Sequence, residues 1–101
     1  MNTHDREEIE RHFAMRVASD RAQSSVTYGT YIEDAPSDAV DVPTKMLWFE
    51  VVGKGKFSES LFHTLYADLY LYGFLPGVTD AEVMTTRFRK HIVGIAFTFD
   101  A

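Results

Sequence analysis

The sequence has no cysteine and a deficit of positive charge. Without cysteine the chain forms no disulfide, no thiolate metal site and no cysteine nucleophile. Its 10 basic residues against 15 acidic ones give a formal net charge of −5. That balance argues against general affinity for nucleic acid, because binding to phosphates requires clustered lysine and arginine. We therefore expect protein partners and no nucleic acid.

Long hydrophobic runs are missing as well. No stretch of the sequence approaches the ~18 consecutive apolar residues of a membrane span. Residues 1–8 are too highly charged to contain the apolar core of a secretory signal. We expect an intracellular, cytoplasmic protein without a membrane partner, and a place in a virion is compatible with this expectation. The length of 101 residues predicts a single domain, residues 1–101.

The motifs of nucleophilic catalysis and nucleotide binding are also missing. No serine lies in a Gly-x-Ser-x-Gly pattern, and residues 53–56 (Gly-Lys-Gly-Lys) match no phosphate-binding or dinucleotide-binding motif. None of the 4 histidines forms a His-x-x-x-His pair. We expect no enzymatic activity, no cofactor and no metal. Residues 53–56 could still hold an anion ahead of a helix, although a flexible turn is the simpler interpretation.

What the sequence does contain is a highly apolar helix between residues 61 and 74. Two rows of side chains recur at four-residue spacing, which aligns each row along a helix: Leu61, Leu65 and Leu69, and beside them Phe62, Tyr66 and Tyr70. Together they exceed the ~100° apolar stripe of a typical surface helix. We expect the polar side to consist of His63, Thr64, Ala67 and Asp68. Either this helix is wedged inside the fold, or another chain covers part of it.

The remaining pattern indicates a small α+β domain. Residues 3–22 have the apolar spacing of an amphipathic helix, and residues 24–32 and 45–52 have the β-branched and aromatic content of strands. Ser58 is placed to cap the central helix, and Gly73 is placed to end it. Thr79 and Glu82 have the spacing of a capping box, so we expect a short helical turn at residues 79–84. The last strand is expected within residues 87–100.

These elements predict the order α-β-β-α-β, with a three-stranded antiparallel or mixed sheet and two helices packed on one face. In the last strand large side chains such as Phe97 alternate with small ones such as Gly94. The central helix could pack closely on the side with the small residues. The alternative, in which it packs on the side with the large residues, is also open. Such a sheet has two free edges, which invite pairing with another chain.

Two charged segments are candidates for docking. Residues 33–44 are expected to form an acidic loop, and a basic cluster follows near residue 90; their charged members include Asp34, Asp38 and Asp41, and Arg87, Arg89 and Lys90. Charge complementarity between the loop of one subunit and the cluster of the next would orient an assembly. Alternatively the cluster, which contains Phe88, would face a nucleic acid backbone.

The order of elements is similar to that of the small α+β proteins that build rings in phage tails and necks. The resemblance lies in element order and includes no residue motif; it implies a ring or connector component. Our leading hypothesis is a non-enzymatic assembly or adaptor protein that self-associates or docks a larger protein through the aromatic helix and a strand edge. Aromatic residues are enriched among interface anchors, and the expected anchors are Trp48, Tyr66, Tyr70, Tyr72 and Phe74.

Two other functions are compatible with the sequence. A small acidic inhibitor of a nucleic-acid-processing complex would use Asp34, Asp38 and Asp41 to mimic phosphates. A small-molecule-binding domain would place its pocket between the central helix and the sheet, where tyrosine hydroxyls would orient the ligand.

Overall fold

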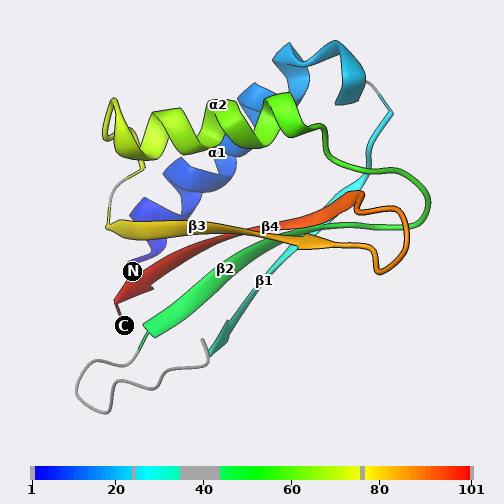
Figure 1. Cartoon of the computed structure of the whole chain (residues 1–101). Helices are drawn as coiled ribbons and strands as arrows, with labels where there is room; N and C mark the ends of the chain where they lie inside the picture. The colour runs from blue at the N-terminus through cyan, green and yellow to red at the C-terminus, as the bar shows by residue number, and fades with distance from the viewer. Residues whose placement is uncertain (1, 24, 35–43, 76, 101) are drawn as a thin grey trace.

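The computed structural model describes residues 2–23, 25–34, 44–75 and 77–100. Its elements follow the order α1 (Thr3–Ser19), η1, a short 3-10 helix (Arg21–Gln23), β1 (Tyr28–Asp34), β2 (Thr44–Val51), α2 (Glu59–Tyr70), β3 (Val78–Thr85) and β4 (Ile92–Asp100). The four strands form one antiparallel sheet in the order β1-β2-β4-β3. Both helices lie on the same face of this sheet (Figure 1). The predicted α+β class is therefore confirmed.

The predicted number of three strands was wrong, because residues 79–84 belong to β3 and not to a helical turn. β3 pairs along β4, with Ala81 opposite Phe97. Thr79, the expected helix cap, instead donates its hydroxyl to the carbonyl of Thr98 at 3.2 Å. Pairing with β4 satisfies the backbone groups that β3 directs to its neighbour along its length, and this outweighs a local capping pattern that satisfies only a few of them.

The start of α2 lies where the sequence predicts it, whereas the helix ends at Tyr70, three residues before Gly73. Ser58 is the N-cap, and its Oγ accepts a hydrogen bond from the backbone N–H of Leu61 at 3.0 Å. Gly73 has a φ of 64°, a left-handed conformation that costs glycine no steric strain. The chain then folds back, so that the N–H of Phe74 donates to the carbonyl of Asp68 at 2.9 Å. Local chemistry thus sets both boundaries of this helix.

The main core lies between the two helices and the sheet. Phe13 of α1 stacks on Phe49 of β2 with their ring centroids 3.9 Å apart. Leu65 of α2 and Phe97 of β4 are fully buried in the same cluster. The large side of β4 therefore faces the helices. Of the two alternatives, the helices pack on the large residues and not on the small ones. α1 itself ends at Ser19, before the predicted end at residue 22.

One face of the sheet carries neither helix (Figure 1), and the small side chains of β4 lie on that face. There Trp48 and Met46 of β2 pack against Ala96. A Cβ atom at Gly94 would lie only 3.1 Å from Trp48 Cζ3. The small residues of β4 therefore make room for the tryptophan and not for a helix. We call this side of the sheet the open face.

Candidate functional site

Large apolar side chains are exposed on α2 and on the turn that follows it. They are Tyr66 (45% exposed), Tyr70 (46%), Leu71 (74%), Tyr72 (62%) and Phe74 (56%). We call these residues the aromatic surface. Isolated exposed apolar residues are common in soluble proteins, but a group of neighbouring ones marks a surface that another molecule covers.

The periodicity of α2 positions these rings. Leu61 and Leu65 point into the core and are 1% and 0% exposed. The adjacent row, which includes Tyr66 and Tyr70, therefore lies beside the buried row and stays partly exposed. Of the two predicted situations, the first does not occur, because α2 is not enclosed on all sides within the monomer.

The rings of the aromatic surface contact one another. The centroids of Tyr66 and Tyr70 are 4.4 Å apart, and Tyr72 stacks on Phe74 at 5.5 Å. The Tyr70 hydroxyl donates to the carboxylate of Asp80 on β3, and this hydrogen bond raises the pKa of Tyr70 to about 12. These contacts restrict the conformations of the rings.

Trp48 lies apart from the other predicted anchors. It sits on the open face, whereas the aromatic surface is on the helix side of the sheet. Only 8% of Trp48 is exposed, and its indole N–H donates to the carboxylate of Glu33. Its ring also stacks beside Tyr31, with centroids 6.4 Å apart. The structure therefore does not bring Trp48 into one surface with Tyr66, Tyr70, Tyr72 and Phe74.

The predicted docking charges lie at opposite ends of the sheet. Asp34 is exposed at the end of β1, where the Lys45 Nζ lies 3.8 Å from its carboxylate. Arg87, Arg89 and Lys90 are exposed in the turn between β3 and β4, at the far end. Asp38 and Asp41 lie outside the described residues. Asp34 and the basic turn could thus meet only between copies, and the proposal that the loop mimics phosphates stays a prediction.

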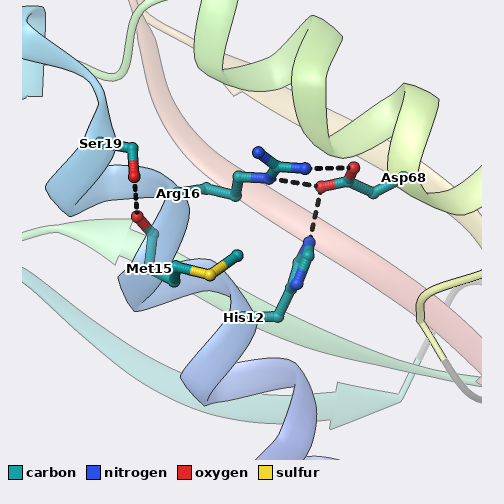
Figure 2. Close-up of polar contacts among 5 residues, drawn as sticks. All are labelled: His12, Met15, Arg16, Ser19 and Asp68. Carbon is teal, nitrogen blue, oxygen red and sulfur yellow. Dashed lines mark hydrogen bonds and ion pairs between the residues drawn. The ribbon is translucent and has the colours of Figure 1, made fainter.

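A buried polar group that joins the two helices was not predicted as a site. Asp68 was expected on the wet side of the central helix, but it is 1% exposed. Arg16 of α1 binds both of its oxygens, from Nε to Oδ2 at 2.8 Å and from Nη2 to Oδ1 at 2.7 Å (Figure 2). His12 of α1 donates from Nε2 to Oδ2 at 2.6 Å.

The bonds to Asp68 keep this buried carboxylate ionised. Burial acts to raise the pKa of Asp68, but the hydrogen bonds from Arg16 and His12 outweigh it and hold that pKa below its ordinary value. The same contact raises the pKa of Arg16. A buried ion pair of this kind fixes geometry more than it adds stability, because each charge loses its hydration. We call these three residues the Asp68 clamp, since they fasten α1 to α2.

A sequence signal for the clamp does exist. Asp68 follows Leu61 and Leu65 with the spacing i, i+4, i+7, so it belongs to the buried row of α2. His12 and Arg16 are four residues apart on α1 and share one side of that helix. The spacing thus places Asp68 in the buried row, whereas its residue type favours the polar side of the helix.

The chemistry available at the clamp is limited. Both oxygens of Asp68 already accept hydrogen bonds from Arg16 and His12. The nearby hydroxyl of Ser19 bonds the carbonyl of Met15 at 2.9 Å and does not approach the clamp (Figure 2). No nucleophile is positioned beside His12 by any of these contacts. The arrangement serves to position α2, and through it the aromatic surface.

A second polar cluster holds the start of α2. The carboxylate of Asp20 accepts from Ser58 Oγ at 2.7 Å and from Ser60 Oγ at 3.1 Å. The hydrogen bond from Ser58 lowers the pKa of Asp20. Gln23, 3% exposed, donates to the carbonyl of Lys56 and accepts from the N–H of Ser58. α2 is therefore anchored both at its first turn and, through Asp68, near its last turn.

Within the described ranges, no three histidine, aspartate or glutamate side chains are grouped so that they could hold a metal ion. None of the described helices is long and apolar enough to cross a membrane. Comparisons with protein-family models, with curated proteins and with solved structures find no match for this chain.

Proposed function

We propose that the protein is a non-enzymatic assembly or adaptor protein that docks another protein through the aromatic surface. One observation carries this proposal: Tyr66, Tyr70, Tyr72 and Phe74 remain 45–62% exposed as neighbours on one side of the chain. Phe13, Phe49 and Phe97, by contrast, are 0% exposed. An exposed aromatic group of this size is costly to leave in water.

The chemistry of the surface supports protein docking in particular. Tyrosine offers a large apolar ring with a polar tip, and it loses little conformational entropy when an interface forms. Tyr66 and Tyr70 already contact each other, and Tyr70 is further held by Asp80. Preorganised rings of this kind form the central anchors of interfaces.

The supporting scaffold is rigid where the docking surface needs it. Asp68 joins α2 to α1, and Asp20 and Gln23 hold the start of α2. The space between α2 and the sheet is filled by side chains such as Leu65 and Phe97, which leaves the small-molecule hypothesis without a specific supporting observation. A ring or connector component of a phage-type particle is the finer form of the proposal, and the similarity of element order is its support.

The test is a double substitution, Tyr66→Ala with Tyr70→Ala, measured by size-exclusion chromatography with light scattering. Truncation of a central anchor typically costs about 2 kcal/mol or more of binding free energy. We therefore expect the assembled mass to fall while the circular dichroism spectrum stays unchanged. Phe88→Ala is the matched control, because Phe88 is 88% exposed but lies in the turn between β3 and β4.

An unchanged assembly mass in the folded double variant would refute the proposal. The outcome would be equally negative if Phe88→Ala reduced the mass as much, because the effect would then not depend on the aromatic surface. Tyr70→Phe separates ring from hydroxyl: it keeps the apolar ring and removes only the bond to Asp80. We expect this variant to assemble almost as well as the unaltered protein.

A further inference from the structure

β1 forms one edge of the sheet, and of the described strands only β2 pairs with it. Its side chains alternate between the two faces, with Tyr31 on the open face and Ile32 on the helix side. Both are exposed, at 38% and 37%. An edge strand offers a row of unpaired N–H and C=O groups to any second strand of suitable shape.

The hydrogen-bond pattern identifies which backbone groups point outward. The N–H of Val52 donates to the carbonyl of Thr27 at 2.8 Å. Hydrogen-bonded and non-bonded pairs alternate along an antiparallel ladder, and Tyr28 lies opposite Val51 in the next pair. Gly29, Tyr31 and Glu33 therefore direct their N–H and C=O groups to β2. The residues between them, Tyr28, Thr30, Ile32 and Asp34, direct these groups to the free edge.

The opposite edge, β3, is less suited to pairing. β3 has register irregularities between Val78 and Asp80 and between Met84 and Thr85. Such bulges interrupt the regular spacing that a second strand would need. β1 pairs with β2 without interruption from Tyr28 to Asp34. Its sequence, YGTYIED, contains neither the proline nor the lysine that commonly protects an edge.

We propose that β1 pairs antiparallel with β1 of a second copy, about a twofold axis at Tyr31, so that two four-stranded sheets become one. This inference deepens the proposed assembly function, and it involves a surface separate from the aromatic surface. β1 spans residues 28–34, so a register centred on Tyr31 pairs the strand over its whole length. Isologous contacts of this kind close as dimers.

The outward groups satisfy one another in this register. Thr30 lies opposite Ile32 of the second copy and Tyr28 lies opposite Asp34, and all four of these positions direct N–H and C=O to the shared edge. Tyr31 faces its own counterpart as a non-bonded pair, in which side chains approach most closely. No two like charges stand directly opposite. A register centred on Glu33 would instead oppose two carboxylates.

Gly29 supplies a matching shape. The edge of the sheet is hollowed there, with a volume of about 250 Å³ lined by Gly29, Tyr31, Glu50 and neighbouring residues of β1 and β2. Residues that are diagonal across a pair lie within reach of an aromatic side chain. Each Tyr31 ring is held on its own Trp48 and Glu50, so the two Tyr31–Trp48 stacks would lie side by side across the axis, and Gly29 leaves room for the neighbouring strand.

The first experiment is cysteine crosslinking, which is free of background because the chain contains no cysteine. In a non-bonded antiparallel pair the Cα atoms are about 4.5 Å apart, within the range that a disulfide bridges. Under mild oxidation Tyr31→Cys should form a dimer at least about tenfold faster than Val83→Cys, since pairing raises its effective concentration. Val83 is a matched control because it is 39% exposed on the other edge strand.

The second experiment needs no substitution. Amide hydrogen exchange should slow at Thr30 and Ile32 by about tenfold or more as the protein is concentrated, because their N–H groups become bonded only in the dimer. The amides of Gly29 and Glu33 should not respond, because β2 already binds them. Equal crosslinking of the two cysteine variants, or rapid exchange at Thr30 and Ile32 at every concentration, would overturn the proposal.

The two interfaces can be tested separately in one further variant. Tyr66→Ala with Tyr70→Ala, combined with Tyr31→Cys, should keep the fast crosslink while it loses any assembly larger than a dimer. Loss of the crosslink in this variant would show that association depends on the aromatic surface and would refute pairing through β1. A retained crosslink together with unchanged larger assemblies would refute the proposed function instead.

Discussion

Arg16 binds Asp68 through two parallel hydrogen bonds, at 2.8 and 2.7 Å, across 52 positions of sequence. The pair joins α1 to α2 inside the protein, where Asp68 is 1% exposed. Because α2 also presents the aromatic surface, the orientation of that surface depends on an ion pair that lies outside it. This relationship leads to two predictions about stability.

Asp68→Asn should destabilise the fold. The substitution removes the charge that Arg16 and His12 bind, and the loss of one partner of a buried pair costs about 3 kcal/mol or more. Arg16 is 30% exposed and can regain some hydration, so we expect the lower end of that range. Urea denaturation measures the change. Glu7→Gln, at an exposed position of α1, is the control; a loss of similar size there would contradict a specific role of the clamp.

The contribution of Asp68 should disappear in acid. Its pKa is held below the ordinary value of 3.8 by hydrogen bonds that overcome the effect of burial. A carboxylate with a lowered pKa stabilises the fold fully above its unfolded-state pKa, and this stability is lost as the pH falls through the folded value. The free-energy difference between the unaltered protein and Asp68→Asn should therefore shrink below about pH 4. A constant difference down to pH 2 in urea titrations would exclude this linkage.

Two tyrosines should ionise late. Hydrogen bonds to Glu50 and Asp80 raise the pKa of Tyr31 and of Tyr70 from 10.0 to about 12. In the folded chain both hydroxyls stay protonated to a higher pH than in the unfolded chain. Their contribution to the stability of the fold is therefore complete below pH 10 and is lost as the pH rises toward 12. Ultraviolet titration of the phenolate measures this directly. Tyr70→Phe should remove one late-ionising group, and an unaltered late phase in that variant would contradict the assignment.

Gly94→Ala should destabilise the open face. A Cβ atom there would lie 3.1 Å from Trp48 Cζ3 and 3.3 Å from Met84 Cβ, and overpacking of this kind costs about 1–3 kcal/mol. At Gly29 a Cβ atom would meet nothing closer than 3.8 Å, so Gly29→Ala is the matched control. Thermal unfolding should separate the two variants. Equal melting temperatures would mean that Trp48 and Met84 move aside without cost.

Sequence patterns predicted the local features well. Ser58 and Gly73 mark the ends of α2, and the spacing of Leu61 and Leu65 identifies its buried row. These features depend on residues within one or two turns of each other, so their physical causes are visible in the sequence. The two central strands and the α+β class followed from composition and alternation in the same way.

Features set by contacts between distant segments were missed. Thr79 and Glu82 have capping-box spacing, but β4 recruits the segment into the sheet. Asp68 looked like a surface residue until α1 supplied two partners for its charge. The partners of both segments lie far away in the chain. The local spacing of Asp68 indicates that it is buried, but it does not identify the residues that bind it.

By itself the sequence determined the positions of the two main helices, where the central helix begins, and that this helix carries two rows of large apolar side chains. Only the tertiary structure decided that the tyrosines of α2 stay partly exposed, that Trp48 lies on the opposite side of the sheet, and that among the described strands β1 is a regular edge paired with β2 alone. The reason is physical: propensity and capping act between neighbours, whereas burial, ion pairing and strand order exist only once remote segments have met.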